Sequence, residues 1–337
     1  MKKIILISFI ILTVFLFGCQ QALTDNPGIH LTPEEEAKGI KVSESGVKYL
    51  LHPSKFFNLN WEYVDEAKLY DLKDKKKFID NPKFVSVQEA DEWINDDQLV
   101  QVLIHEGVKR VYPIKIQDKH NIINDVVADT PVLIAWCGLC GTGLVLERTL
   151  DGQVLEFGNA GLIYNSNVVM YDRNTDSIWT LAGASAVYGE LTGKRLKVIE
   201  SDTALWGDWK TAHSDSEVLS LDTGFDIEYK YNYGRYTDYV GSPVLFFPIE
   251  NKDTRIHLKD VVFGIEVDGV FKAYREEDLK ELGTIEDTVN GVRVKVTRDE
   301  VGQVRITNLD TNEPIIKERD LWFGWSAFHP ETELYTR

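Results

Sequence analysis

The sequence predicts a mainly β protein, of the β-rich α+β class, in which duplicated antiparallel strand units form one large compact domain with a few short helices. Three observations predict this class. Short β-branched and aromatic runs recur about every ten residues from Leu99 onward, with turn signals between them. Asp268-Gly269 and Asn290-Gly291 are strong hairpin turns. In addition, residues 100–137 align without a gap with residues 262–299, which indicates an internal repeat.

The first 18 residues predict a lipoprotein signal peptide. Met1–Lys3 is a short positive start, and Ile4–Phe17 is an apolar run shorter than the about 20 residues that span a bilayer. The run ends at Leu16–Cys19, which resembles a bacterial lipobox with Cys19 as the lipidated residue. An uncleaved N-terminal anchor is the alternative. In both cases we expect the protein in the cell envelope, outside the cytoplasmic membrane and anchored to a membrane.

Residues 19–47 are polar and predict a flexible tether, which leaves residues 48–337 for the single β-rich domain. The formal net charge of the full chain is -17. Loss of Lys2 and Lys3 with the signal peptide takes the side-chain charge to -19. Because phosphate binding needs a basic face, this charge argues against a nucleic-acid partner.

The expected elements follow one another with short turns between them. Strands are expected at residues 100–104, 108–114, 131–136, 144–148, 154–157 and 168–171, and again at 244–247, 261–267, 270–274, 292–297 and 304–308. Short helices are expected at 85–94, where Ser86 is a plausible N-cap, and at 203–212 and 276–282.

The repeat separates residues that the fold needs from residues that it can do without. Both copies have a glycine in the first turn and a tyrosine at the end of the second strand. The chemically suggestive residues occur in the first copy alone. The aligned pairs are Cys137 with Asp299, His120 with Leu282, and Cys140 with Gly302 if the register continues. The unit therefore does not need cysteine or histidine at these positions to fold.

A set of landmark motifs runs through most of the mature chain. They are Asp80–Phe84, Val111–Pro113, His120–Asp125, Cys137–Gly141, Gly161–Asn167, Met170–Arg173, Ser177–Trp179 and Phe323–Thr332. In these motifs the chain resembles the domain-of-unknown-function 3179 family of largely exported microbial proteins. It departs from the family pattern at Asn121, Gly138 and Leu181, where Glu, Pro and Gln are usual. The resemblance implies an architecture and candidate residues but no reaction.

Cys137 and Cys140 form a Cys-x-x-Cys turn between two apolar strand-like runs. Such a pair is a candidate for thiol redox chemistry. The residues Gly141–Gly143 and a strand follow it, so no helix of the thioredoxin kind is expected to stabilise a thiolate. Together with His120, the two thiolates could bind a Zn, Cu or Fe ion. A structural disulfide is the third interpretation.

Asn165, Asn167, Asp172 and Arg173 are candidates for a polar pocket beside this turn, because amides and a guanidinium orient small anions. The alternative is that Asp172 and Arg173 form a buried pair or cap a turn.

The sequence thus predicts a lipid-anchored extracytoplasmic protein whose Cys-x-x-Cys site binds a metal or performs thiol redox chemistry. The alternative is a non-enzymatic ligand-binding or scaffolding lipoprotein in which the cysteines form a structural disulfide. No general base, hydrolase motif or nucleotide motif identifies a reaction or shows that the protein is an enzyme.

Overall fold

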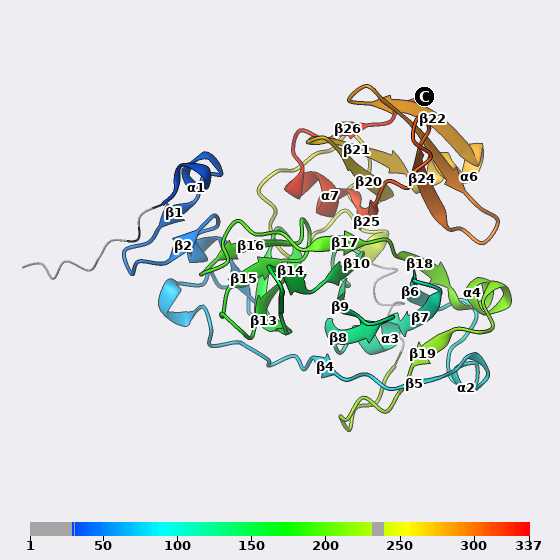
Figure 1. Ribbon diagram of the computed structural model, residues 1–337, viewed down its shortest axis with the longest axis horizontal. Coiled ribbons are helices and arrows are strands. Elements are labelled where there is room, and N and C mark those ends of the chain that lie inside the picture. The colour runs from blue at the N-terminus through cyan, green and yellow to red at the C-terminus, as the bar shows by residue number, and fades with distance from the viewer. Residues whose placement is uncertain (1–28, 30, 231–238) are drawn as a thin grey trace, which may run out of the picture. The chain divides into compact units, whose positions relative to one another are not determined.

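The computed structural model describes residues 29, 31–230 and 239–337. Residues Leu31–Arg337 belong to one compact unit. The described part is mainly β with mostly antiparallel sheets, which confirms the predicted fold class (Figure 1). No helix of the described residues is long and apolar enough to cross a membrane. The expected signal peptide and Cys19 lie outside these residues.

The first repeat copy supplies two five-stranded sheets. The order β18-β6-β7-β19-β5 joins β18 (Asp202–Leu205), β6 (Leu99–His105), β7 (Val108–Pro113), β19 (Glu217–Leu219) and β5 (Phe84–Ser86). The order β17-β10-β9-β8-β4 joins β17 (Lys197–Ile199), β10 (Thr142–Glu147), β9 (Thr130–Cys137), β8 (Ile122–Val127) and β4 (Ile79–Asp80). Its helices are α2 (Val87–Ala90), α3 (Ile114–Gln117) and α4 (Trp206–Ala212).

The second copy supplies a four-stranded and a three-stranded sheet. The order β25-β20-β21-β26 joins β25 (Lys317–Leu321), β20 (Val261–Val267), β21 (Val270–Arg275) and β26 (Glu333–Leu334). The order β22-β23-β24 joins β22 (Thr284–Val289), β23 (Val292–Arg298) and β24 (Val304–Asn308). Its helices are α6 (Glu276–Leu282) and α7 (Trp322–Phe328).

A seven-stranded sheet lies largely within an insertion in the first copy. It joins β1 (Lys41–Val42), β2 (Lys48–Tyr49), β16 (Ser185–Tyr188), β15 (Ile178–Thr180), β14 (Asn167–Asp172), β13 (Phe157–Tyr164) and β3 (Phe57–Asn58). A separate hairpin consists of β11 (Thr149–Leu150) and β12 (Gln153–Val154). Strand β1 and helix α1 (Pro33–Ala37) lie in the segment expected to be a tether.

The structural repeat is longer than the aligned residues. In each copy a strand, a helix and a second strand return to the first hairpin: β18-α4-β19 in one and β25-α7-β26 in the other. The side-chain contacts repeat as well. Trp209 Nε1 donates to Ser216 Oγ at 3.0 Å, and Trp325 Nε1 donates to Thr332 Oγ1 at 2.8 Å. The strands between β10 and β18 hide this part of the duplication from an ungapped alignment.

Four expectations about local structure are wrong. The helix expected at residues 203–212 begins at Trp206, because the residues before it pair with β6 as β18. The strand expected at residues 154–157 is divided between β12 and β13. The helix expected at residues 85–94 is shortened to α2, although Ser86 caps it as predicted. The strand expected at residues 244–247 does not form. The carbonyl of Val244 accepts a hydrogen bond from Lys259 Nζ at 2.7 Å, and Val244 is exposed, so no neighbouring strand completes a ladder there.

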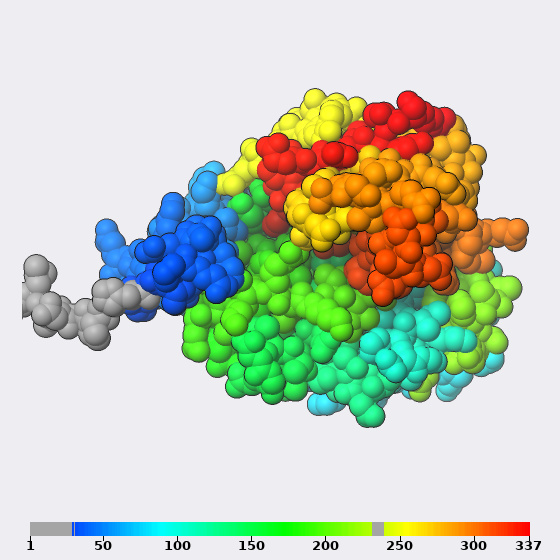
Figure 2. Space-filling view, turned by 45° about the horizontal axis from the view of Figure 1, so that its top comes forward, coloured from blue at the N-terminus to red at the C-terminus, as the bar shows by residue number. Residues whose placement is uncertain are grey.

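The two repeat copies contact each other through the β9–β10 turn of the first copy and the β23–β24 turn of the second. The second copy (yellow to red) lies against the first (cyan to green) in Figure 2, and β10 neighbours β25 across this boundary. Leu321 N–H donates to Cys140 O at 2.8 Å, and Val304 N–H donates to Asp202 Oδ2 at 3.2 Å. The turn between β9 and β10 therefore packs on β25 and α7, and the turn between β23 and β24 packs on β18.

Candidate functional site

The two cysteines lie at the end of the β9–β10 hairpin. Cys137 is the last residue of β9 and pairs with Thr142, the first residue of β10. Gly141, with a φ of 68°, closes the turn through a hydrogen bond from its N–H to Cys137 O at 2.9 Å. Both cysteines are free thiols with no exposed surface, and their Sγ atoms are 2.7 Å apart.

The turn of the second copy is one residue shorter. Trp136 pairs with Gly143 in the first copy, whereas Arg298 pairs with Val304 in the second. Gly302 N–H bonds Asp299 O at 3.1 Å, as Gly141 does in its own turn. The alignment of Cys140 with Gly302 is therefore wrong, because Gly302 takes the place of Gly141.

Cys140 is held by two polar side chains from β10 and β14. Asn167 Nδ2 donates to Cys140 Sγ at 3.0 Å, and Thr142 Oγ1 lies 3.0 Å from the same sulfur. Thr142 Oγ1 also forms a hydrogen bond with Asp320 Oδ1 on β25. A hydroxyl has one proton. Thr142 can therefore donate to a Cys140 thiolate while it accepts from protonated Asp320. It can also donate to the Asp320 carboxylate, and it then accepts from the Cys140 thiol when that thiol is not donating to Cys137.

The surroundings make the two thiols unequal. Burial raises the pKa of Cys137, but hydrogen bonds from the Cys140 thiol and from backbone N–H groups at Cys140, Val168 and Leu139 outweigh burial and lower it. Burial raises the pKa of Cys140 well above its usual value, and the neighbouring Cys137 raises it further. Cys137 therefore loses its proton more readily than Cys140.

Lys76 is a cation close to the Cys137 side of the pair. Burial lowers the pKa of Lys76 to about 8, while the charges of Asp118 and Cys137 act in the opposite direction. The charges of Lys76 and Cys137 thus interact, and an ammonium at Lys76 favours a Cys137 thiolate because opposite charges stabilise each other.

Asp320 lies on β25, and its buried carboxyl forms a hydrogen bond with Thr142 Oγ1. It is 1% exposed, and burial raises its pKa to about 6. Glu318 lies two residues earlier and therefore faces the same side of the strand. Burial and the charge of Asp320 raise the pKa of Glu318 to about 8. Glu318 also lines a cavity of about 580 Å³. Asp320 thus contacts Thr142, and Glu318, two residues earlier on the same side of β25, borders that cavity.

The other copy does not have this arrangement. Asp320 pairs with Val262 on β20, and the structurally equivalent position, which pairs with Val100 on β6, is Ala204. Thr142 pairs with Cys137, the last residue of β9. In the second copy the residue equivalent to Cys137 is Asp299, and its N–H donates to the carbonyl of Gln303 at 3.0 Å. Gln303 therefore takes the place of Thr142. The fold can therefore be built without this hydroxyl and this carboxyl.

His120 is not beside the two thiols. Its Nδ1 lies 3.0 Å from Lys77 O, and its Nε2 lies 2.7 Å from Tyr229 Oη. The ring also stacks on Phe225. Both nitrogens therefore have partners, and the expected ligand set of Cys137, Cys140 and His120 is not assembled. Within residues 31–230 and 239–337, no group of three or more His, Cys, Asp or Glu could hold a metal ion.

The four candidate pocket residues are divided between the two ends of β14. Asn167 contacts Cys140, and Asn165 occupies the β13–β14 turn, where its Nδ2 donates to Ala327 O at 3.3 Å. Asn165 lines a separate cavity of about 500 Å³ with α7 residues. Asp172 lies about 16 Å along the strand from Asn167.

Asp172 and Arg173 hold the far end of the hairpin. Asp172 accepts hydrogen bonds from Thr175 N–H at 2.6 Å and from Trp179 Nε1 at 2.9 Å. Arg173 forms ion pairs with Asp80 at 3.0 Å and with Glu156 at 2.8 Å. The structure therefore does not bring the four residues into one pocket, and of the four, Asn167 is the one that contacts a cysteine.

Thr142, Asp320, Glu318 and Lys76 are the site residues that sequence reasoning missed. A signal for Asp320 does exist in the sequence. Leu321-Trp322 matches Leu205-Trp206, and this second alignment places Asp320 opposite Ala204. The same test that singled out Cys137 as present in one copy alone would have singled out Asp320.

Comparisons with known proteins identify a family. A family model described as "Protein of unknown function (DUF3179)" matches residues 77–313, which is 237 of the 337 residues and includes the Cys137–Cys140 turn. Searches of curated proteins and of solved structures found no match. The chain belongs to the DUF3179 family.

Proposed function

We propose that the Cys137–Cys140 pair performs thiol–disulfide exchange in a lipoprotein anchored outside the cytoplasmic membrane. The observation that carries the reaction is the chain of contacts from Cys140 through Thr142 to the buried carboxyl of Asp320. The location rests on the signal-peptide pattern and the lipobox-like end at Cys19.

Exchange needs one thiolate to begin and a second to finish. The Cys137 thiolate attacks one sulfur of a partner disulfide, so that a mixed disulfide forms and the other partner sulfur leaves as a thiolate that takes a proton from water. Cys140 then passes its proton through Thr142 to Asp320 and attacks Cys137 Sγ. The Cys137–Cys140 disulfide forms, and the second partner sulfur leaves and is protonated. The pair is oxidised by two electrons, and the partner disulfide is reduced to two thiols.

A structural disulfide would not need the buried carboxyl. Asp320 Oδ2 has no hydrogen-bond partner among the described residues, and a buried polar atom of this kind costs about 1–3 kcal/mol. The equivalent position in the first copy is the apolar Ala204, so the cost at Asp320 does not arise from the fold. Groups with strongly raised pKa values next to a candidate nucleophile are typical of sites that move protons.

The burial of both sulfurs sets a condition on the reaction. Gly138 and Leu139, at the tip of the turn, are partly exposed, whereas Cys137 and Cys140 are not. A partner disulfide therefore reaches Cys137 when the turn opens locally. We expect exchange to be slower with a bulky protein disulfide than with a small one.

The redox potential of the pair tests the proposal. The purified protein is equilibrated in glutathione buffers of stepped potential, and the fraction of free thiol is measured by mass after alkylation. We expect reversible oxidation with a midpoint between about -270 and -120 mV, the range of exchange proteins. A midpoint below about -300 mV would mean a structural disulfide and would overturn the proposal.

A matched pair of variants assigns the two roles. Cys140→Ser keeps the attacking thiolate and should accumulate a mixed disulfide with glutathione at Cys137. Cys137→Ser keeps the high-pKa thiol and should accumulate much less. Equal labelling of the two variants would contradict the assignment of Cys137 as the attacking residue.

The full burial of both sulfurs favours a second candidate function. In it the protein is a non-enzymatic ligand-binding or scaffolding lipoprotein, and the cysteine pair stabilises the turn as a disulfide. The potential measurement separates the two candidates. A low potential, together with unchanged ligand binding in the Cys137→Ser/Cys140→Ser double variant, would support the second.

A further inference from the structure

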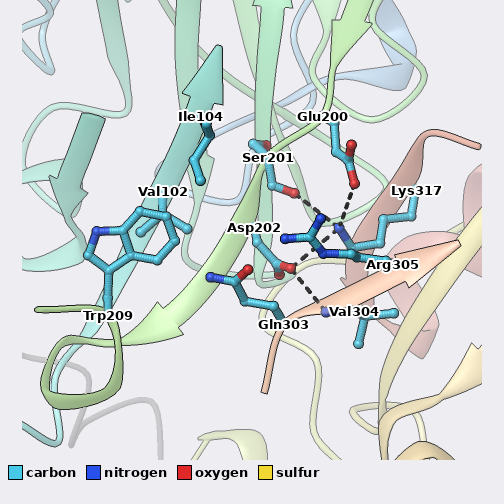
Figure 3. Close-up of a pocket in the computed structure, with 10 residues that line it drawn as sticks. All are labelled: Val102, Ile104, Glu200, Ser201, Asp202, Trp209, Gln303, Val304, Arg305 and Lys317. Carbon is cyan, nitrogen blue, oxygen red and sulfur yellow. Dashed lines mark hydrogen bonds and ion pairs between the residues drawn. The ribbon is translucent and has the colours of Figure 1, made fainter. Parts of the chain in front are cut away.

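The turn of the second copy borders a cavity. The segment between β23 and β24 packs on β18 and α4, as the cysteine turn packs on β25 and α7. Here the two copies leave a cavity of about 230 Å³ (Figure 3). Its lining residues are Val102, Ile104, Glu200, Ser201, Asp202, Trp209, Gln303, Val304, Arg305 and Lys317.

One wall of the cavity is apolar and the other is charged. Val102, Ile104 and the Trp209 ring form the apolar wall, and Figure 3 shows Lys317 on the side opposite Trp209. Gln303 lies between them in the same view. A ligand that fills the cavity therefore meets apolar surface at one end and polar groups at the other.

The acidic groups in the cavity already have partners. Asp202 Oδ2 accepts from Val304 N–H at 3.2 Å and lies 3.3 Å from Lys317 Nζ. The Lys317 ammonium also lies 3.9 Å from Glu200 Oε1 and donates to Ser201 O at 3.4 Å. Lys317 thus contacts both carboxylates but balances the charge of one, and the guanidinium of Arg305 brings the charge of the four ionisable lining residues to zero.

Two hydrogen-bond donors of the lining are without partners in the described part of the chain. Gln303 is 8% exposed, and its Nε2 has no partner among the described residues. The Arg305 side chain is exposed and forms no hydrogen bond or ion pair with the side chains and backbone that the structure describes. A buried amide donor without a partner is uncommon in native proteins and calls for an acceptor.

We propose that this cavity binds a small carboxylate with an apolar or aromatic body. The carboxylate accepts hydrogen bonds from Arg305 and, once its side-chain amide turns toward the ligand, from Gln303, and the apolar body lies against Trp209, Val102 and Ile104. A guanidinium binds a carboxylate through two parallel hydrogen bonds, which an uncharged oxygen acceptor cannot match. The cavity is smaller than most drug-sized pockets, which restricts the ligand to one ring or a short aliphatic chain.

Binding of 4-fluorobenzoate to the full chain, followed by ¹⁹F NMR line broadening, tests the proposal. We expect saturable binding at millimolar concentration, and binding of the uncharged 4-fluorobenzamide at least about tenfold more weakly, because a hydrogen bond to a charged group contributes more than a neutral one. Equal binding of the two probes, or binding of neither, would overturn the assignment.

Two variants and a control locate the probe. Arg305→Gln should weaken 4-fluorobenzoate about tenfold without changing the melting temperature, because the side chain is exposed. Gln303→Leu removes the second donor and should also weaken binding. Arg293→Gln, a change of the same kind on β23 outside the cavity, should leave affinity unchanged. An affinity unaltered in Arg305→Gln would refute the proposed mode of binding.

The site is independent of the thiol chemistry. The Cys137→Ser/Cys140→Ser double variant should bind 4-fluorobenzoate as the unmodified protein does. A loss of affinity in the double variant would mean that the probe binds near the cysteine turn, and this would contradict the assignment to the Gln303 cavity.

Discussion

Replacing Asp320 by asparagine removes the proton acceptor next to Thr142 while the shape of the side chain is kept. If Asp320 takes the Cys140 proton, the second step of exchange should slow at neutral pH. General-base catalysis by a positioned side chain contributes about 10²–10⁴-fold. We therefore expect the closure of the Cys137 mixed disulfide to be about 100-fold slower at pH 7 in Asp320→Asn.

The same substitution has a stability effect of known sign. Burial raises the pKa of Asp320 from 3.8 to about 6 in the folded protein. The folded protein therefore holds a proton that the unfolded chain has lost between these values, and its stability falls as the pH rises through this window. At 1.36 kcal/mol per pKa unit, the loss between pH 4 and pH 7 is about 2 kcal/mol. The asparagine variant lacks this loss, so its stability relative to the parent should rise by this amount.

Two measurements check the reasoning. Single-turnover release of glutathione from the Cys137 mixed disulfide gives the closure rate against pH, which should level off above about pH 6 in the parent and keep rising in Asp320→Asn. Urea unfolding at pH 4 and pH 7 gives the stability difference. Asp278→Asn, a buried aspartate on α6, is the control. A closure rate equal to that of the parent, or a relative stability that falls with pH, would refute the proton role.

Three further predictions concern the surroundings of the turn. Glu318→Gln should slow closure of the Cys137 mixed disulfide less than Asp320→Asn does. It should also remove the loss of stability that occurs as the pH rises toward the Glu318 pKa of about 8. Closure rates and urea unfolding at pH 6 and pH 9 check these two results. Gly324→Ala should lower the free energy of unfolding by about 1–3 kcal/mol, because the new Cβ would lie 3.0 Å from Cys140 Cβ; thermal unfolding measures it. His120→Ala should lower the free energy of unfolding by about 1–3 kcal/mol, because the hydrogen bond to Tyr229 is lost, and should leave the redox midpoint of the cysteine pair unchanged. Unfolding and glutathione titration measure the two quantities. A shifted midpoint would contradict the position of His120 away from the thiols.

The parts of the fold that follow from local chemistry were predictable from the sequence. The turns at Asp268-Gly269 and Asn290-Gly291 form between paired strands as expected, because those residues adopt the positive φ angles that tight hairpins need. The cysteine turn was also located correctly between two strands. The helix at Ser86 is capped as expected but ends early, since a cap specifies where a helix begins and not how far it extends.

The metal-site hypothesis failed because the sequence pattern does not indicate the hydrogen-bond partners of His120. His120 lies in the preceding segment of the same repeat, and this proximity in sequence suggested that it could reach Cys137 and Cys140. Its ring nitrogens are instead bonded to Lys77 O and Tyr229 Oη. Tyr229 lies more than a hundred residues away in the chain, and no periodicity or spacing in the sequence indicates such a pairing.

The sequence by itself determined the strand units, their duplication and the position of the Cys137–Cys140 pair, because turn chemistry, side-chain alternation and internal alignment are local properties. The tertiary structure alone decided what surrounds Cys140. Thr142 and Asp320 come from different repeat copies, and they meet because the β9–β10 turn of one copy packs on β25 of the other. Burial in that contact raises the pKa values of Asp320 and Cys140, and burial is a property of the packed chain that the order of residues does not display.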